Sequence, residues 1–127
     1  PATMSETLAV TGVKETGFSA CESCHDGSEV DYVVTMERDG NSNRHPLSLA
    51  MYSDQPSYIG GSSVATSTMA GITSLVWSAF PADNRAQILN RLKYASQLYP
   101  NRHPDFGWGR VDAAEAVQFN VLDAQDL

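Results

Sequence analysis

The sequence lacks the features that mark membrane proteins and nucleic-acid-binding proteins. No run of apolar residues among its 127 positions is long enough to cross a lipid bilayer. Basic residues are few, with 8 Lys and Arg against 15 Asp and Glu, and the resulting net charge of −7 would repel a phosphate backbone. We therefore expect neither a membrane span nor a nucleic-acid partner.

The chain also lacks internal repeats, low-complexity segments and a basic-then-apolar N-terminal segment of the kind that marks a signal peptide. It begins at Pro1 rather than at a methionine, which favours a processed or excised chain. Hydrophobic residues make up 42 % of the sequence and charged residues 18 %, as in ordinary globular proteins. Residues 1–127 are therefore expected to form one domain or part of a larger one.

Strand-forming residues are concentrated in the first half of the chain. The β-branched and apolar segments at residues 7–13 and 29–36 predict two strands, and residues 46–59 could hold one or two more. Residues 17–27 read as a loop by composition, and residues 38–46, which hold Gly, Asn, Ser and Pro, predict a turn or an exposed loop.

Helical periodicity dominates the second half. After the Gly-Gly-Ser-Ser break at residues 60–63, apolar residues recur at spacings of three and four as far as Phe80, and Pro81 ends the helix. Its apolar surface is broad, because it includes Leu75 and Trp77. This breadth predicts a helix that is buried on most sides.

Two shorter helices are predicted after it, the first capped by Asp83 and the last, over residues 113–119, capped by Asp112. The first of them has a buried stripe, which consists of Ile88, Leu89, Leu92 and Ala95. Its polar residues are predicted to lie away from that stripe, and they are Arg85, Asn90, Arg91 and Lys93. Strands followed by helices favour an α/β domain whose helices cover a sheet.

Ser63 stands where the glycine-rich turn meets the long helix. Unpaired backbone N–H groups and the positive end of the helix dipole point to this place, and they can stabilise the oxyanion of a tetrahedral acyl intermediate. The neighbouring Gly60 and Gly61 let a substrate backbone approach closely. Serine is also a common helix N-cap residue, so the junction alone does not separate a nucleophile from a capping residue.

Residues 61–71, Gly-Ser-Ser-Val-Ala-Thr-Ser-Thr-Met-Ala-Gly, resemble a known nucleophile motif. It is that of the subtilisin-like serine peptidases, Gly-Thr-Ser-Met-Ala-Thr-Pro-His-Val-Ala-Gly, in which the third residue is the nucleophile. The outright matches are Gly61, Ser63, Ala65, Thr66, Ala70 and Gly71. Ser67 and Thr68 replace the Pro-His pair of the family.

The resemblance continues in the right order along nearly the whole chain. Pro1-Ala2 and the Leu-Ala-Val-Thr-Gly-Val at residues 8–13 are similar to a family strand, and Phe18-Ser19 to its Phe-Ser loop. Residues 29–31 resemble the strand that follows, and residues 107–117 resemble the closing Gly-Tyr-Gly-Arg-Val-Asn-Ala … Ala-Val. The resemblance implies the C-terminal portion of a three-layer α/β fold, with a mostly parallel sheet and a long buried helix starting at Ser63.

In that family the serine attacks a peptide carbonyl, a histidine takes the proton, an aspartate orients the histidine, and the serine N–H and an asparagine side chain hold the oxyanion. The resemblance therefore implies that Ser63 is the nucleophile, and its backbone part of the oxyanion hole, of an endopeptidase that acts on peptides or proteins. The family's aspartate, histidine and asparagine lie upstream of the segment matched here, and His25, His45 and His103 do not take the histidine's place. An upstream half of the domain is the implied partner, and the chain alone is predicted to be inactive.

Two alternatives share this fold. A non-catalytic relative would keep Ser63 without the triad, and a peptide ligase or macrocyclase would open the acyl-enzyme with an amine. Because most of the family act outside the cytoplasm and many bind calcium, the resemblance also implies an extracellular or extracytoplasmic location, with calcium as a candidate ligand of the intact protein.

The segment Cys-Glu-Ser-Cys-His at residues 21–25 allows four interpretations. It matches the c-type haem attachment pattern, with Cys21 and Cys24 bonded to the porphyrin and His25 on the iron. With His45 it could instead bind zinc. The cysteines could also be free thiols or a local disulfide. We favour the disulfide, by analogy with a family that acts outside the cytoplasm, and expect no haem or metal in this chain.

Asp26, Glu29 and Asp31 form an acidic cluster beyond this segment. Their spacing matches no calcium-binding loop, so a solvated acidic surface is predicted.

Overall fold

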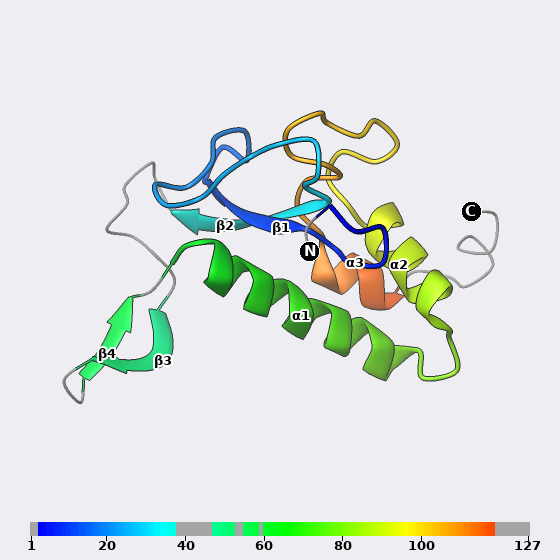
Figure 1. Cartoon of the computed structure of the whole chain (residues 1–127). Helices are drawn as coiled ribbons and strands as arrows, with labels where there is room; N and C mark the ends of the chain where they lie inside the picture. Colours follow the sequence, from blue (N-terminus) through cyan, green and yellow to red (C-terminus); the bar gives the residue numbers. More distant parts are fainter. Residues whose placement is uncertain (1–2, 38–46, 53–54, 59, 119–127) are drawn as a thin grey trace.

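The computed structural model describes residues 3–37, 47–52, 55–58 and 60–118 (Figure 1). In these ranges the strands are β1 (Val10–Lys14), β2 (Tyr32–Glu37), β3 (Leu47–Tyr52) and β4 (Gln55–Tyr58). The helices are α1 (Ser62–Ala79), α2 (Arg85–Tyr94) and α3 (Ala113–Gln118). This mixture of parallel strands and covering helices confirms the expected α/β fold class.

The strands β1 and β2 pair in parallel, from Val10 opposite Tyr32 to Lys14 opposite Glu37. Both begin three residues later than predicted. The carboxylate of Asp31 explains the late start, because it accepts a hydrogen bond from the Ala9 N–H at 2.9 Å, in place of a backbone acceptor on β2. The Asp31 and Tyr32 N–H groups both donate to the Ala9 carbonyl, so the ladder begins at this irregular pairing.

The ambiguous segment at residues 46–59 contains two strands. β3 and β4 pair antiparallel with each other, and within the described ranges neither pairs with β1 or β2. The loop predicted at residues 38–46 lies outside the described residues.

The long helix α1 runs along one face of β1 and β2, and α3 and α2 pack beside it (Figure 1). Its buried residues are Ala65, Met69 and Val76, which share one stripe. The prediction of burial on most sides is wrong for this chain, since Leu75 is 55 % and Trp77 41 % exposed. The other described elements cover only one side of α1. Within the described ranges, no helix has the length and apolar character needed to cross a bilayer.

The start of α2 differs from the prediction. Asn84 caps it through a capping box, in which the Gln87 N–H donates to Asn84 Oδ1 and the Asn84 N–H donates to Gln87 Oε1, both at 2.9 Å. Asp83 instead forms an ion pair with Arg91, which is fully buried. Arg91 therefore does not lie away from the buried stripe as predicted. Its charge is accommodated because a carboxylate and an aromatic ring, that of Phe80, face it.

The core joins the sheet to all three helices and contains Tyr32, Met69, Val76, Ile88, Leu92, Ala95 and Ala116. As predicted, Asp112 caps α3, because its carboxylate accepts a hydrogen bond from the Glu115 N–H at 3.0 Å. Residues 107–109 form a turn against β2, where the Trp108 N–H donates to the Asp31 carbonyl at 2.8 Å and the Val33 N–H donates to the Gly109 carbonyl at 3.0 Å.

Candidate active site

Ser63 is the second residue of α1, which begins at Ser62, one residue before the predicted start. The residue before the helix, Gly61, has a φ of 93°, in the left-handed region that favours glycine. The first intrahelical hydrogen bond runs from the Ala65 N–H to the Gly61 carbonyl at 3.1 Å, so the amides of residues 62–64 precede it. The exposed side chain of Ser63 thus lies beside the positive end of the helix dipole.

Hydroxyl side chains follow Ser63 around the first turns of α1. The hydroxyls of Thr66, Ser67 and Thr68 each donate to the carbonyl four residues earlier, at 2.9, 3.0 and 2.9 Å. Two of them stand where the resembled motif has Pro-His, and back-bonding of this kind is how such residues are accommodated inside a helix. Among the described residues, no hydrogen bond engages the Ser63 hydroxyl itself.

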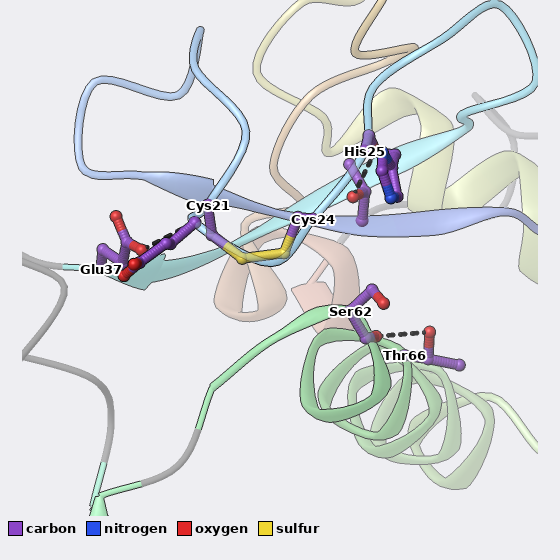
Figure 2. The surroundings of a disulfide bond; sticks show 8 residues. Cys21, Cys24, His25, Glu37, Ser62 and Thr66 are labelled. Atoms are coloured by element: carbon purple, nitrogen blue, oxygen red, sulfur yellow. Dashed lines mark hydrogen bonds between the residues drawn. A yellow bond between two sulfur atoms is a disulfide. The ribbon is translucent and has the colours of Figure 1, made fainter.

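Cys21 and Cys24 form a disulfide, and both are nearly buried (Figure 2). This is the arrangement favoured from the sequence. The turn that carries it is held to the sheet at both ends, because the Cys21 N–H donates to the Gly12 carbonyl at 2.9 Å and Thr11 Oγ1 donates to the His25 carbonyl at 2.6 Å. The Glu22 N–H, inside the turn, donates to Glu37 Oε1 at 2.8 Å.

A cleft of about 440 Å³ lies beside the start of α1. Its lining combines apolar side chains with hydroxyl, imidazole and carboxylate groups, among them Leu8, Val10, His25, Asp26, Glu29, Ser62 and Thr66. The cleft therefore offers both an apolar floor and polar groups next to Ser62, whereas Ser63 is not among its lining residues.

The histidines do not form a dyad with Ser63 in the described structure. His25 lines the cleft, but no hydrogen bond joins it to Ser63 within the described ranges. His103 packs against the rings of Phe18 and Phe106, with centroids 5.6 and 5.2 Å away, and its Nδ1 accepts from the Asp105 N–H at 3.0 Å. His45 lies outside the described residues, as does the zinc site that would use it.

The acidic cluster is divided by the fold. Asp26 and Glu29 are exposed, as predicted, and face the cleft. Asp31 is only half exposed, because it accepts from the Ala9 N–H and forms an ion pair with Arg102 at 3.3 Å. In the described part of the chain, no group of three or more His, Cys, Asp and Glu side chains could hold a metal ion.

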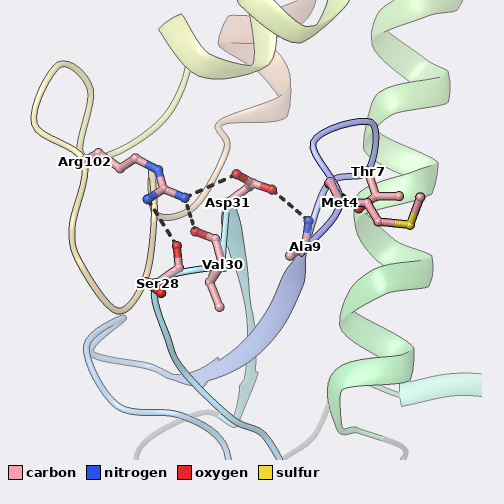
Figure 3. Close-up of polar contacts among 7 residues, drawn as sticks. All are labelled: Met4, Thr7, Ala9, Ser28, Val30, Asp31 and Arg102. Carbon is pink, nitrogen blue, oxygen red and sulfur yellow. Dashed lines mark hydrogen bonds and ion pairs between the residues drawn. The ribbon is translucent and has the colours of Figure 1, made fainter. Parts of the chain in front are cut away.

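Arg102 is a structural contact that sequence analysis missed. Its guanidinium donates to the Val30 carbonyl at 2.7 Å and to the Ser28 carbonyl at 3.4 Å, and so fixes one wall of the cleft (Figure 3). It is 71 residues from Asp31 in the sequence, and no local pattern signals such a pairing.

Comparisons with known proteins identify the fold of this chain. No protein-family model and no curated protein matches the sequence. Solved structures do match, including MycP1 from Mycobacterium smegmatis, with a TM-score of 0.71 and 22 % identity over 94 % of this chain. A protease from Pseudoalteromonas arctica matches with a TM-score of 0.70 and 24 % identity over 93 % of this chain. The chain has a subtilisin-like fold.

The subtilisin-like fold confirms the architecture implied by the sequence motifs. This chain spans 32 % of the length of MycP1, 39 % of MycP1 without its N-terminal propeptide, and 37 % of the Pseudoalteromonas protease. It therefore spans between about a third and two fifths of the length of the subtilisin-like proteases that it matches.

Proposed function

We propose that this chain is the nucleophile-bearing part of a subtilisin-like serine endopeptidase, and that Ser63 is the nucleophile. The observation that carries the proposal is an exposed Ser63 on the first turn of α1, within a fold matched at a TM-score of 0.71 to a protease-like structure. The structure also gives a physical reason for the residue type at two other motif positions. Gly61 has a left-handed φ, and Ala65 is fully buried, where a larger side chain would not fit.

The proposed reaction starts with attack of the Ser63 hydroxyl on a peptide carbonyl. A base takes the hydroxyl proton and passes it to the departing amine, and water then hydrolyses the acyl-enzyme. The backbone N–H of Ser63 precedes the first intrahelical hydrogen bond, so it is available to donate to the oxyanion. The described residues thus supply a nucleophile and an oxyanion donor, but no base.

We propose that an upstream half of the domain supplies the base and covers the outer side of α1. Ala70 and Gly71 are exposed there, and a Cβ built on Gly71 meets no described atom within 4 Å. Leu75 and Trp77 are exposed on the same helix. An uncovered apolar surface, on a chain about a third as long as its structural neighbours, supports a missing covering segment. The Cys21–Cys24 disulfide supports an extracytoplasmic location, since such bonds persist in oxidising compartments.

The decisive experiment is labelling of the full-length protein with a fluorophosphonate probe, followed by intact mass and peptide mapping. The proposal expects one adduct, on Ser63, and its loss in Ser63→Ala. Ser74→Ala is the matched control, because Ser74 is an exposed serine of the same helix away from its first turn. A folded full-length protein that takes no label at Ser63 would instead be the non-catalytic relative, which the Ser67-Thr68 departure from the motif favours as second candidate.

A further inference from the structure

The disulfide turn (residues 21–24) packs directly on the first turn of α1. Cys21, Cys24 and Ala65 belong to one buried cluster, in which Ala65 is fully buried. Ser23 Oγ lies 3.1 Å from the position that a Cβ on Gly61 would occupy. The turn therefore lies against the chain on both sides of Ser63, at Gly61 just before α1 and at Ala65 in its first turn.

The sulfur atoms have no free space on the side of the sheet. A Cβ on Gly12 of β1 would lie 2.8 Å from Cys24 Sγ and 3.2 Å from Cys21 Sγ, so the disulfide fills the space left by this glycine. Ala65 belongs to the same buried cluster from the side of α1. Two thiols need van der Waals separation instead of a covalent bond, so they occupy more room and must displace a neighbour.

The disulfide turn is bonded to β1 at its ends, through Gly12 and Thr11, and within it the Cys24 N–H donates to the Cys21 carbonyl at 2.9 Å. Inside the turn, the Glu22 N–H bonds to Glu37, a fully buried carboxylate whose Oε2 has no partner among the described residues. This contact carries a desolvation cost, so it replaces the covalent bond poorly. The disulfide is the covalent constraint on the part of the turn that touches α1, and it acts together with the hydrogen bond between Cys24 and Cys21.

We propose that the Cys21–Cys24 disulfide is a redox switch for Ser63, which is competent when the disulfide is formed and impaired when it is reduced. The proposal rests on the proposed peptidase function of Ser63. Reduction would move Ala65 and Gly61, and with them the amide of Ser63 that donates to the oxyanion. Catalytic geometry tolerates only small displacements, and a misplacement of about 1 Å can cost about 100-fold in rate.

The chemistry needs a dithiol reductant. One of its thiolates attacks a sulfur of the cystine, the bond between Cys21 and Cys24 breaks, and a mixed disulfide forms. The second thiol of the reductant resolves this intermediate and leaves as part of its own disulfide. Two electrons and two protons pass to the cysteines, which end as thiols. Cys24 is the more exposed of the two, at 9 % against 3 %, and so is the more accessible point of attack.

The test uses the full-length protein, oxidised, then reduced with dithiothreitol, then reoxidised, with the disulfide state followed by intact mass. Amide hydrogen exchange is measured over residues 61–66, with α2 as the internal control. The rate of fluorophosphonate labelling at Ser63 is measured in parallel. We expect reduction to speed exchange in residues 61–66 but not in α2, to slow labelling about 10-fold, and to be reversed by reoxidation.

A double variant, Cys21→Ser with Cys24→Ser, controls for effects of dithiothreitol elsewhere. It should match the reduced protein in both measurements and show no response to the reductant. If the double variant does not fold, the test depends on whether exchange and labelling in the unaltered protein change on reduction and recover on reoxidation. Unchanged exchange in residues 61–66 overturns the switch, and so does equal labelling in both redox states. If reduction speeds exchange but Ser63 takes no label in either redox state, the coupling between the disulfide and α1 is supported. The proposed peptidase function is then refuted.

Discussion

The guanidinium of Arg91 lies 3.4 Å from the centroid of the Phe80 ring, at the connection between α1 and α2. It is fully buried, and its Nε donates to Asp83. Phe80 follows the end of α1, Asp83 lies in the loop after it, and Arg91 belongs to α2. The contacts among these three residues thus fix the angle between α1 and α2. A buried cation of this kind is tolerated only because its partners lie in place.

Removal of this cation should destabilise the protein strongly. We expect Arg91→Ala to lower the free energy of unfolding by about 3–5 kcal/mol, because it leaves the Asp83 carboxylate buried and unpaired. Arg85→Ala is the control: Arg85 is an exposed arginine of the same helix, bonded to the Glu6 carbonyl, and its loss should cost at most about 1 kcal/mol. Urea denaturation of the full-length protein measures both. Equal effects would show that the buried pair has no special role.

Gly71 tests whether α1 is covered in the full-length protein. In the isolated chain, Gly71→Ala should stabilise by about 0.5–1 kcal/mol, because alanine favours a helix and its Cβ meets no described atom. In the full-length protein we expect the same change to destabilise, because the proposed upstream half packs at this position. Denaturation midpoints of both forms decide. If Gly71→Ala stabilises both forms, this side of α1 stays exposed in the full-length protein. Ser74→Ala is the control, because its effect on stability should have the same sign in both forms.

Tyr32 should make stability fall at alkaline pH. Burial, with a smaller contribution from the nearby Asp31 carboxylate, raises the pKa of its hydroxyl above the ordinary value. The folded state therefore keeps its proton when the unfolded state loses it, so the contribution is fully present below about pH 10 and is lost as pH rises toward the folded pKa. Tyr32→Phe should flatten this decline in a comparison of denaturation midpoints near neutrality and above pH ~10. Tyr99→Phe is the control: it changes a half-buried tyrosine and should leave the alkaline decline of stability unchanged.

The isolated chain should not react as a peptidase. We expect no fluorophosphonate adduct on it, because the described residues provide Ser63 with no base. Its intact mass should correspond to the bare polypeptide with one disulfide and no covalent haem. An adduct at Ser63 would show that a base is present within the chain. An isolated chain that is monomeric and as stable as the full-length protein would contradict the proposed upstream half.

Local patterns in the sequence were sufficient to predict much of the scaffold. The spacing of apolar residues located α1, and Asp112 was correctly assigned as a cap, because periodicity and capping depend on neighbours in the chain. The motif around Ser63 indicated the fold, and the solved structures confirm it. The nucleophilic role of Ser63 stays a prediction.

Features that depend on distant contacts could not be predicted in this way. Arg91 looked like an exposed helical residue because its burial depends on where Phe80 and Asp83 lie in space. Asp31 looked solvated for the same reason, since its partner Arg102 is remote in the sequence. The burial of α1 was overestimated, because amphipathic width shows what a helix can bury and not which neighbours the chain supplies.

The turn at residues 107–109 limits how the two-stranded sheet can grow. It already takes the outward-facing hydrogen bonds at the start of β2, through Asp31 and Val33. On the opposite edge, Ser19 and Cys21 engage Lys14 and Gly12 at the end of β1. Beside the beginning of β1, Val10 lines the cleft at the start of α1, so a strand added at this edge would extend the sheet toward that cleft.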